Sequence, residues 1–187
     1  MVELSDFRKG TKVLIEGVPW VVVDFQHVKP GKGNQFTRTK LKNLLTGSNL
    51  ERTFKSGEKF EIPDVVNRDM TFLYKEGTAF MFMDKTSYDQ IGIEGSELGD
   101  ATLYLTENLE CTVLFFNGKA IGADVPRSVN LKITRTDPGL KGNTVSGGGK
   151  PATLETGHVV SVPLHLNEGD VIRVDTGTGK YIERVSS

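Results

Sequence analysis

Polar and apolar positions alternate over most of the chain, and this period of two predicts short β-strands. Within residues 11–28, a Gly-Val-Pro break separates two β-branched runs, which predicts two strands joined by a turn. Glycine and aspartate separate the later runs. Further strands are predicted in residues 36–44, 50–57, 58–63, 69–77, 78–84, 87–95, 128–137, 159–166, 169–177 and 179–185.

The segment that joins the strands of 11–28 and 36–44 has the sequence VKPGKGNQF and carries Lys32 between two glycines. Its Pro-Gly and Gly-Asn pairs favour turns, so we expect the tip of a β-hairpin here. On the strand that follows, the alternation places three basic residues on one face: Arg38, Lys40 and Lys42.

Three other segments have distinct patterns. Residues 96–110 are the one helical candidate, because Leu98, Ala101, Leu105 and Leu109 fall near one helix face. Residues 111–126 predict a hairpin that turns at Asn117-Gly118. Residues 138–157 are rich in glycine and predict a long loop.

Short strands with closely spaced turns favour closed barrels, which leave no open sheet edge. Breaks near Pro63 and Pro126 divide the pattern into three parts. We therefore predict a mostly β protein made of three consecutive small β-barrels with little helix, in residues 1–64, 65–127 and 128–187.

The composition fits a globular protein, with 37% hydrophobic and 25% charged residues in 187. The N-terminus lacks the pattern of a standard export signal, and no apolar run is long enough to span a membrane. The single cysteine, Cys111, lies in an apolar run and is expected in a core. These features predict a cytoplasmic protein without a membrane partner.

Charge is sorted along the chain although the total is −1. Residues 1–64 carry 11 Lys and Arg against 8 Asp and Glu, a net +3; residues 65–127 carry 5 against 10, a net −5; residues 128–187 carry 7 against 6, a net +1. No acid occurs between Phe25 and Leu50. This stretch is therefore expected to attract RNA phosphates locally.

Catalytic and metal motifs are not matched. TVSGGGKP has Thr144 and Pro151 where a phosphate-binding loop needs Gly and Ser or Thr. The Asp-Thr-Gly triplet at Asp175 occurs once, where a hairpin turn explains it. Three histidines without metal-ligand spacing predict no metal site. We expect no enzymatic activity, although an unrecognised hydrolase site stays a third alternative.

Lys32 has two interpretations. An isolated lysine in a glycine-rich turn is usually a solvated surface residue. Here, however, the strand behind the turn carries basic charge, and a narrow glycine tip suits insertion into an RNA crevice. The residues alone thus favour an RNA-directed finger, with a generic RNA-binding module or RNA chaperone as the alternative.

Two long blocks resemble the bacterial elongation factor P family, and the resemblance covers essentially all 187 residues. Residues 6–61 resemble the first domain of that family, and residues 136–185 resemble its third. The resemblance implies an N-terminal SH3-like, KOW-type barrel followed by two OB-folds in an L-shaped arrangement. It also implies a monomer, without a cofactor, that binds the ribosome between the P and E sites and relieves stalling at consecutive prolines.

The resemblance further implies roles for single residues. Lys32 matches the hairpin-tip lysine that points toward the acceptor end of the P-site peptidyl-tRNA and that a lysine-modifying enzyme extends in many members, for example by β-lysylation. The flanking tip matches at Lys29, Pro30, Gly31 and Gly33. In the third domain, ribosomal and messenger RNA contacts are implied for Tyr181, Arg184 and the loop Gly142, Asn143 and Thr144, where the family usually has aspartate in place of Asn143.

Overall fold

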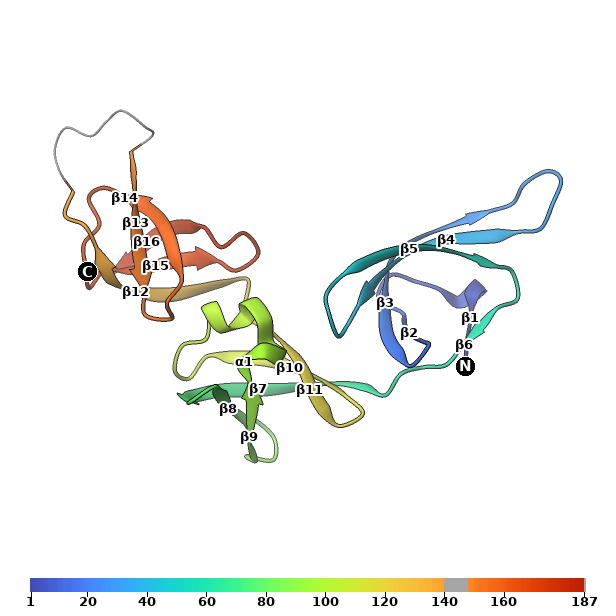
Figure 1. Ribbon diagram of the computed structural model, residues 1–187, viewed down its shortest axis with the longest axis horizontal. Coiled ribbons are helices and arrows are strands. Elements are labelled where there is room, and N and C mark those ends of the chain that lie inside the picture. The colour runs from blue at the N-terminus through green and yellow to red at the C-terminus, as the bar shows by residue number, and fades with distance from the viewer. Residues whose placement is uncertain (140–147, 187) are drawn as a thin grey trace. The chain divides into compact units, whose positions relative to one another are not determined.

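The computed structural model describes residues 1–139 and 148–186, and most of them lie in β-strands (Figure 1). The prediction of a mostly β protein with little helix is confirmed. Contacts group the chain into two compact units, Met1–Asn67 with Leu114–Ile121 and Arg68–Val113 with Gly122–Ser187. The domain boundaries proposed from the sequence stay predictions. Within the described ranges, every helix is too short or too polar to cross a membrane.

The N-terminal residues form a four-stranded antiparallel sheet in the order β2-β3-β4-β5, together with a two-stranded sheet of β1 and β6. The strand predicted in residues 58–63 is reduced to two residues, which pair with Val2 and Glu3. A core of Leu4, Phe7, Val13, Val22, Leu41, Phe54 and Phe60 fills the space between the sheets. The elements are β1 (Val2–Glu3), 3-10 helix η1 (Leu4–Asp6), β2 (Lys12–Ile15), β3 (Val18–Val28), β4 (Phe36–Asn43), β5 (Asn49–Lys55) and β6 (Lys59–Phe60).

Strands β3 and β4 form the predicted hairpin. They pair from Trp20 opposite Asn43 to Val28 opposite Phe36, with a bulge between Val22 and Asp24. Figure 1 shows the end of this hairpin projecting beyond the other strands of its sheet. The tip is therefore supported by two long paired strands, although it is not itself packed.

The middle of the chain forms a five-stranded sheet in the order β11-β10-β7-β8-β9. The hairpin turn predicted at Asn117-Gly118 is confirmed, with positive φ angles of 49° and 79° that a tight primed turn requires. The strands are β7 (Val65–Glu76), β8 (Ala79–Asp84), β9 (Gln90–Glu94), β10 (Glu110–Phe116) and β11 (Lys119–Asp124).

The helix predicted over residues 96–110 is wrong in length. The structure has a four-residue helix α1 (Gly95–Leu98) followed by a 3-10 helix η2 (Gly99–Leu103). Gly99 has φ +55° and ψ −134°, which no α-helical residue adopts, so the helix ends there. The spacing of the apolar residues in this segment indicates which side chains are buried and not a continuous helix, since Leu98, Ala101 and Leu105 are buried.

The C-terminal sheet has the order β14-β13-β12-β15-β16. The loop predicted over residues 138–157 is partly wrong, because β13 lies within it and pairs with β14. Lys150, Ala152 and Leu154 alternate inward, a period that the neighbouring glycines obscured. The strands are β12 (Ser128–Thr136), β13 (Gly149–Leu154), β14 (Val159–Pro163), β15 (Val171–Asp175) and β16 (Tyr181–Ser186).

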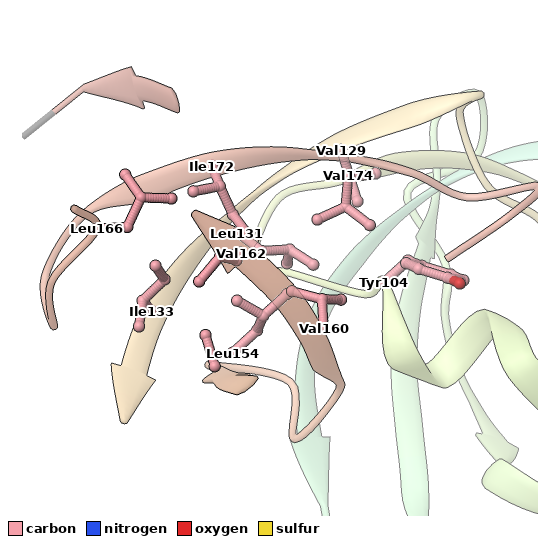
Figure 2. Close-up of a cluster of buried hydrophobic side chains, with 11 residues drawn as sticks. Tyr104, Val129, Leu131, Ile133, Leu154, Val160, Val162, Leu166, Ile172 and Val174 are labelled. Atoms are coloured by element: carbon pink, nitrogen blue, oxygen red, sulfur yellow. The ribbon is translucent and has the colours of Figure 1, made fainter. Parts of the chain in front are cut away.

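A cluster of buried hydrophobic side chains packs on this C-terminal sheet (Figure 2). It also contains Tyr104, which comes from the segment directly after η2 and is 6% exposed. The other members are Val129, Leu131, Ile133, Ala152, Leu154, Val160, Val162, Leu166, Ile172 and Val174. A side chain from the middle of the chain thus completes the core of the C-terminal sheet.

Candidate nucleic-acid interface

The hairpin tip presents Lys32 to solvent. All residues from Lys29 to Gln35 are exposed. Gly33 has φ +130°, a conformation that side chains resist, and a Cβ there would lie 3.7 Å from the Pro30 ring. A Cβ on Gly31 would meet no atom within 4 Å. The tip is narrow at both glycines, so the lysine side chain is its most prominent feature.

The base of the tip is fixed, in contrast. The His27 ring Nδ1 lies 2.8 Å from the Thr37 hydroxyl across the hairpin, and the Phe25 and His27 rings meet edge to face at 5.2 Å. The backbone N–H of Ser56 donates to the Gln35 carbonyl at 3.1 Å. The His27–Thr37 contact joins β3 to β4, and the Ser56 bond joins Gln35 to the segment after β5, so the tip has a defined root.

The predicted basic face of β4 is confirmed as a face. Arg38, Lys40 and Lys42 are exposed, and the alternate residues Thr39 and Leu41 are fully buried. The Arg38 guanidinium also lies 5.9 Å from the centroid of the Phe36 ring, a cation–π distance. Whether these cations bind RNA stays a prediction.

Two acids that lie just outside the acid-free stretch flank the central cation of this face. Asp24 on β3 pairs with Lys40, and Glu51 on β5 pairs with Lys40 on the other side. Directly paired residues share one face of an antiparallel sheet, with Cβ atoms about 5 Å apart. Sequence reasoning missed both acids, because the strand register and not the chain order brings them together.

In the C-terminal part, Arg184 donates to the Asp170 carboxylate at 3.1 Å. Asp170 is buried, and its second oxygen accepts the backbone N–H of Asn167 at 2.9 Å. The Arg184 side chain is still 40% exposed, so it is anchored at one side and open at the other. Tyr181 is partly buried against the C-terminal core. The predicted contacts at Gly142, Asn143 and Thr144 lie outside the described residues.

The residues of the rejected motifs have structural roles. Lys150, from the failed phosphate-loop pattern, is 6% exposed and donates to the Asp137 carbonyl. Asp175, from the lone Asp-Thr-Gly triplet, accepts the backbone N–H groups of Thr178 and Gly177 at 2.8 Å each and holds a turn. These hydrogen bonds lower the pKa of the Asp175 carboxyl, the bond from Thr178 most strongly.

Three further features of the described residues bear on chemistry: the potential metal ligands, the lining of one cavity, and Cys111. In residues 1–139 and 148–186, no three His, Cys, Asp or Glu side chains are arranged to hold a metal ion. A cavity of about 860 Å³ contains the Thr78 hydroxyl, which donates to the Glu94 carboxylate at 2.7 Å, and no histidine or cysteine lines it. Cys111 is buried as predicted, and burial raises the pKa of its thiol to about 11.

Tyr104 marks a packed junction that sequence reasoning also missed. Its ring meets the His158 ring edge to face at 5.5 Å, and His158 Nε2 lies 3.0 Å from the Gly179 carbonyl. Nearby, the Thr156 hydroxyl donates to the Leu103 carbonyl at 2.6 Å. Burial raises the pKa of the Tyr104 phenol, and the negative charges of Asp100 and Asp175 add to the shift.

Three family models match successive parts of the chain. The elongation factor P KOW-like domain matches residues 3–60, its OB domain matches residues 65–123, and its C-terminal domain matches residues 129–184. The prediction of a KOW-type domain followed by OB-folds is therefore confirmed.

Individual relatives agree with the family models. The chain is 62% identical to elongation factor P of Bdellovibrio bacteriovorus over 186 residues, covering 100% of this chain and 99% of that protein. It is 50% identical to elongation factor P of Finegoldia magna over 185 residues, covering 99% of this chain and 100% of that protein. Among solved structures, eukaryotic translation initiation factor 5A from Methanococcus jannaschii matches with a TM-score of 0.51 and 23% identity, over 67% of this chain and 90% of that one. At this identity the last match shows the fold alone.

Proposed function

The chain belongs to the elongation factor P family of translation factors, and on this premise we propose that it binds the ribosome between the P and E sites and stimulates peptide-bond formation at consecutive prolines. The observation that carries the proposal is the exposed Lys32 on a narrow glycine tip with a fixed root. In the proposal, this tip reaches the acceptor end of the P-site peptidyl-tRNA.

Proline makes a poor partner in peptide transfer, because its ring fixes φ and restricts the geometries from which reaction proceeds. The ribosome performs the chemistry in this proposal. The factor lowers the entropic cost of alignment by holding the acceptor end of the tRNA. A lysine is suited to this role, because its ammonium offers three donors on a flexible four-carbon stem that reaches phosphate and ribose oxygens.

Basic residues behind the tip support the same partner. Arg38 and Lys42 are exposed on β4, where they would contact RNA backbone. In the C-terminal part, the open side of Arg184 is available for ribosomal RNA, since Asp170 occupies only one side of the guanidinium. The proposal includes covalent extension of Lys32 by a lysine-modifying enzyme, for example by β-lysylation, which would lengthen the reach of the tip.

A reconstituted translation assay tests the proposal. We expect Lys32→Ala to lower synthesis of a Pro-Pro-Pro reporter about tenfold or more, since misalignment of reacting groups is costly, and to leave a proline-free reporter unchanged. Lys85→Ala is the control, because it removes one lysine from the acidic middle of the chain, together with its ion pair to Glu110 at 2.9 Å. Equal stimulation by the wild type and Lys32→Ala would contradict the proposal.

Two further measurements separate the parts of the proposal. Mass spectrometry of the peptide from Lys29 to Arg38, taken from the native host, tests the covalent extension through the mass at Lys32. Co-sedimentation with ribosomes separates a ribosome-specific factor from a generic RNA-binding module, which would bind free single strands equally well.

A further inference from the structure

The exposed face of the first sheet alternates in charge from one row of paired residues to the next. Arg38 lies between Gln26 and Thr53, and neither neighbour is charged. Lys42 likewise lies beside Val21 and Asn49. The row between them, defined here as the acidic row, consists of Asp24, Lys40 and Glu51 and has a net charge of −1.

The acids of this row are accessible to solvent and to a ligand. Asp24 has a side chain that is 54% exposed, and it lies 3.8 Å from the Lys9 ammonium as well as beside Lys40. Glu51 is exposed on β5. Asp24 is thus ion-paired with Lys9 and lies opposite Lys40 in the strand register, and Glu51 lies opposite Lys40 on the other side.

The surroundings of Lys40 offer little to a phosphate. A hollow of about 380 Å³ is lined by Val23, Lys40, Asn49, Leu50 and Glu51. Val23 and Leu50 are 45% and 43% exposed, so much of the hollow is apolar. A nucleic-acid backbone that crossed this row between Asp24 and Glu51 would meet two carboxylates and an apolar surface around Lys40, while the second nearby cation, Lys9, is already ion-paired with Asp24.

We propose that Asp24 and Glu51 are specificity-determining residues that prevent the first sheet from binding RNA backbone indiscriminately. Specific recognition often requires a repulsive element as well as attractive contacts. The inference rests on the proposed function in one respect, since it takes RNA as the partner of Arg38 and Lys42. The acidic row restricts that contact to two separated cations and to the hairpin.

The spacing of the cations on β4 is short enough for the acidic row to repel a phosphate bound at either of them. Arg38 and Lys42 are four residues apart, which is about 13 Å along a strand. A phosphate at either cation is therefore within about 7 Å of the acidic row, which is less than the Debye length of about 8 Å at physiological salt. A strand of RNA laid along β4 would experience repulsion at its centre, whereas an RNA that touches one end would not.

Binding of a fluorescently labelled 20-nucleotide poly(U) strand, measured by anisotropy without ribosomes, tests the proposal. We expect the double variant Asp24→Asn/Glu51→Gln to bind poly(U) about five- to tenfold more tightly at 50 mM salt than the wild type. The plot of log affinity against log salt should steepen by about 0.7 for each added phosphate contact. Glu16→Gln/Glu61→Gln is the control, with the same change in total charge at residues outside the acidic row: Glu16 lies in the turn between β2 and β3, and Glu61 is bridged to Leu14.

Lys40→Gln provides a second variant that keeps the test decisive. As a single substitution, Lys40→Gln should change poly(U) affinity less than twofold, because the neighbouring carboxylates of Asp24 and Glu51 already offset the charge of Lys40. In the Asp24→Asn/Glu51→Gln background it should remove most of the gain, and this difference isolates the coupling. Unchanged affinity in the double variant, or an equal gain in the matched control, would overturn the proposal.

The result is independent of the proline assay. If Lys32→Ala retains full activity, the proposed function fails while the poly(U) result still decides the role of the acidic row. If the double variant gains no affinity, the acidic row fails while the ribosomal role of Lys32 is unaffected.

Discussion

The hairpin tip and the Tyr104 junction differ in how one side chain is surrounded. At the tip, Lys32 is exposed between glycines, and the contacts that hold the hairpin lie several residues away. At the junction, Tyr104 is buried in the C-terminal core, with His158 against its ring and Gly179 beside its hydroxyl. Lys32 is therefore accessible to a ligand, whereas Tyr104 contributes to the stability of the packed core.

Substitutions at these two places should therefore affect different properties, function at the tip and stability at the junction. A side chain without packed neighbours contributes little to the free energy of unfolding, so its loss should be visible only in function. A buried aromatic residue contributes through many contacts, so its loss should first reduce stability. Measurements of unfolding free energy on paired variants can distinguish the two effects.

The largest effect is expected for Tyr104→Ala. Truncation of a buried aromatic residue costs about 3–5 kcal/mol of unfolding free energy, whereas Lys32→Ala should stay within about 0.5 kcal/mol of the wild type. Tyr104→Phe is the matched control, because it retains the ring and should lose less than about 1 kcal/mol. Urea unfolding followed by circular dichroism measures all three, and a similar midpoint for Tyr104→Ala and Lys32→Ala would break the comparison.

A pair of glycines gives a medium effect. A Cβ on Gly139 would lie 2.3 Å from the Leu164 carbonyl oxygen, whereas a Cβ on Gly31 would meet nothing within 4 Å. We expect Gly139→Ala to lose about 1–3 kcal/mol through overpacking, and Gly31→Ala to change stability by less than about 0.5 kcal/mol. Thermal unfolding of both variants decides, and an equal loss would show that the tip is packed after all.

The smallest effect is a dependence on acid in the turn after β8. Asp84 accepts the backbone N–H groups of Thr86 and Ser87 at 2.7 and 3.1 Å, and these hydrogen bonds hold the pKa of its carboxyl below the usual range. A lowered folded-state pKa stabilises the fold above the unfolded value of about 3.9, and the stability is lost as pH falls through the folded pKa.

Asp84→Asn should therefore flatten the fall in the urea midpoint between about pH 5 and pH 2. Asp89→Asn, two residues beyond Ser87, is the matched control with the same loss of charge. If both variants keep the full acid dependence of the wild type, this turn does not contribute to it. The tip should show no such dependence, because its only ionisable groups are lysines.

Much of the fold could be predicted because its signals are local. The period of two places Thr39 and Leu41 inside and the basic residues outside, and Asn117-Gly118 supplies its own turn. The tip was predictable for the same reason, since a Pro-Gly-Lys-Gly sequence has few conformations other than a turn. Local chemistry was sufficient in each case.

The remaining features depend on partners that are distant in the sequence. Helical periodicity around Leu98 suggested a long helix, but the apolar residues pack in two short turns that Gly99 separates. Asp170 could not be assigned to Arg184, nor Asp24 and Glu51 to Lys40, before the strand register was known. Tyr104 is the extreme case, because its core is formed by strands that begin more than twenty residues later.

The most direct test of the account is a cross-link from the hairpin tip on ribosomes stalled at Pro-Pro-Pro. The variant Asn34→Cys carries a photoreactive group beside an intact Lys32, and Cys111 should resist labelling because its buried thiol has a pKa of about 11. Thr46→Cys, in the turn at the other end of β4, is the control. We predict a cross-link from residue 34, and not from residue 46, to the acceptor end of the P-site tRNA; no cross-link to that tRNA, or equal cross-links from both positions, would contradict the central role given to Lys32.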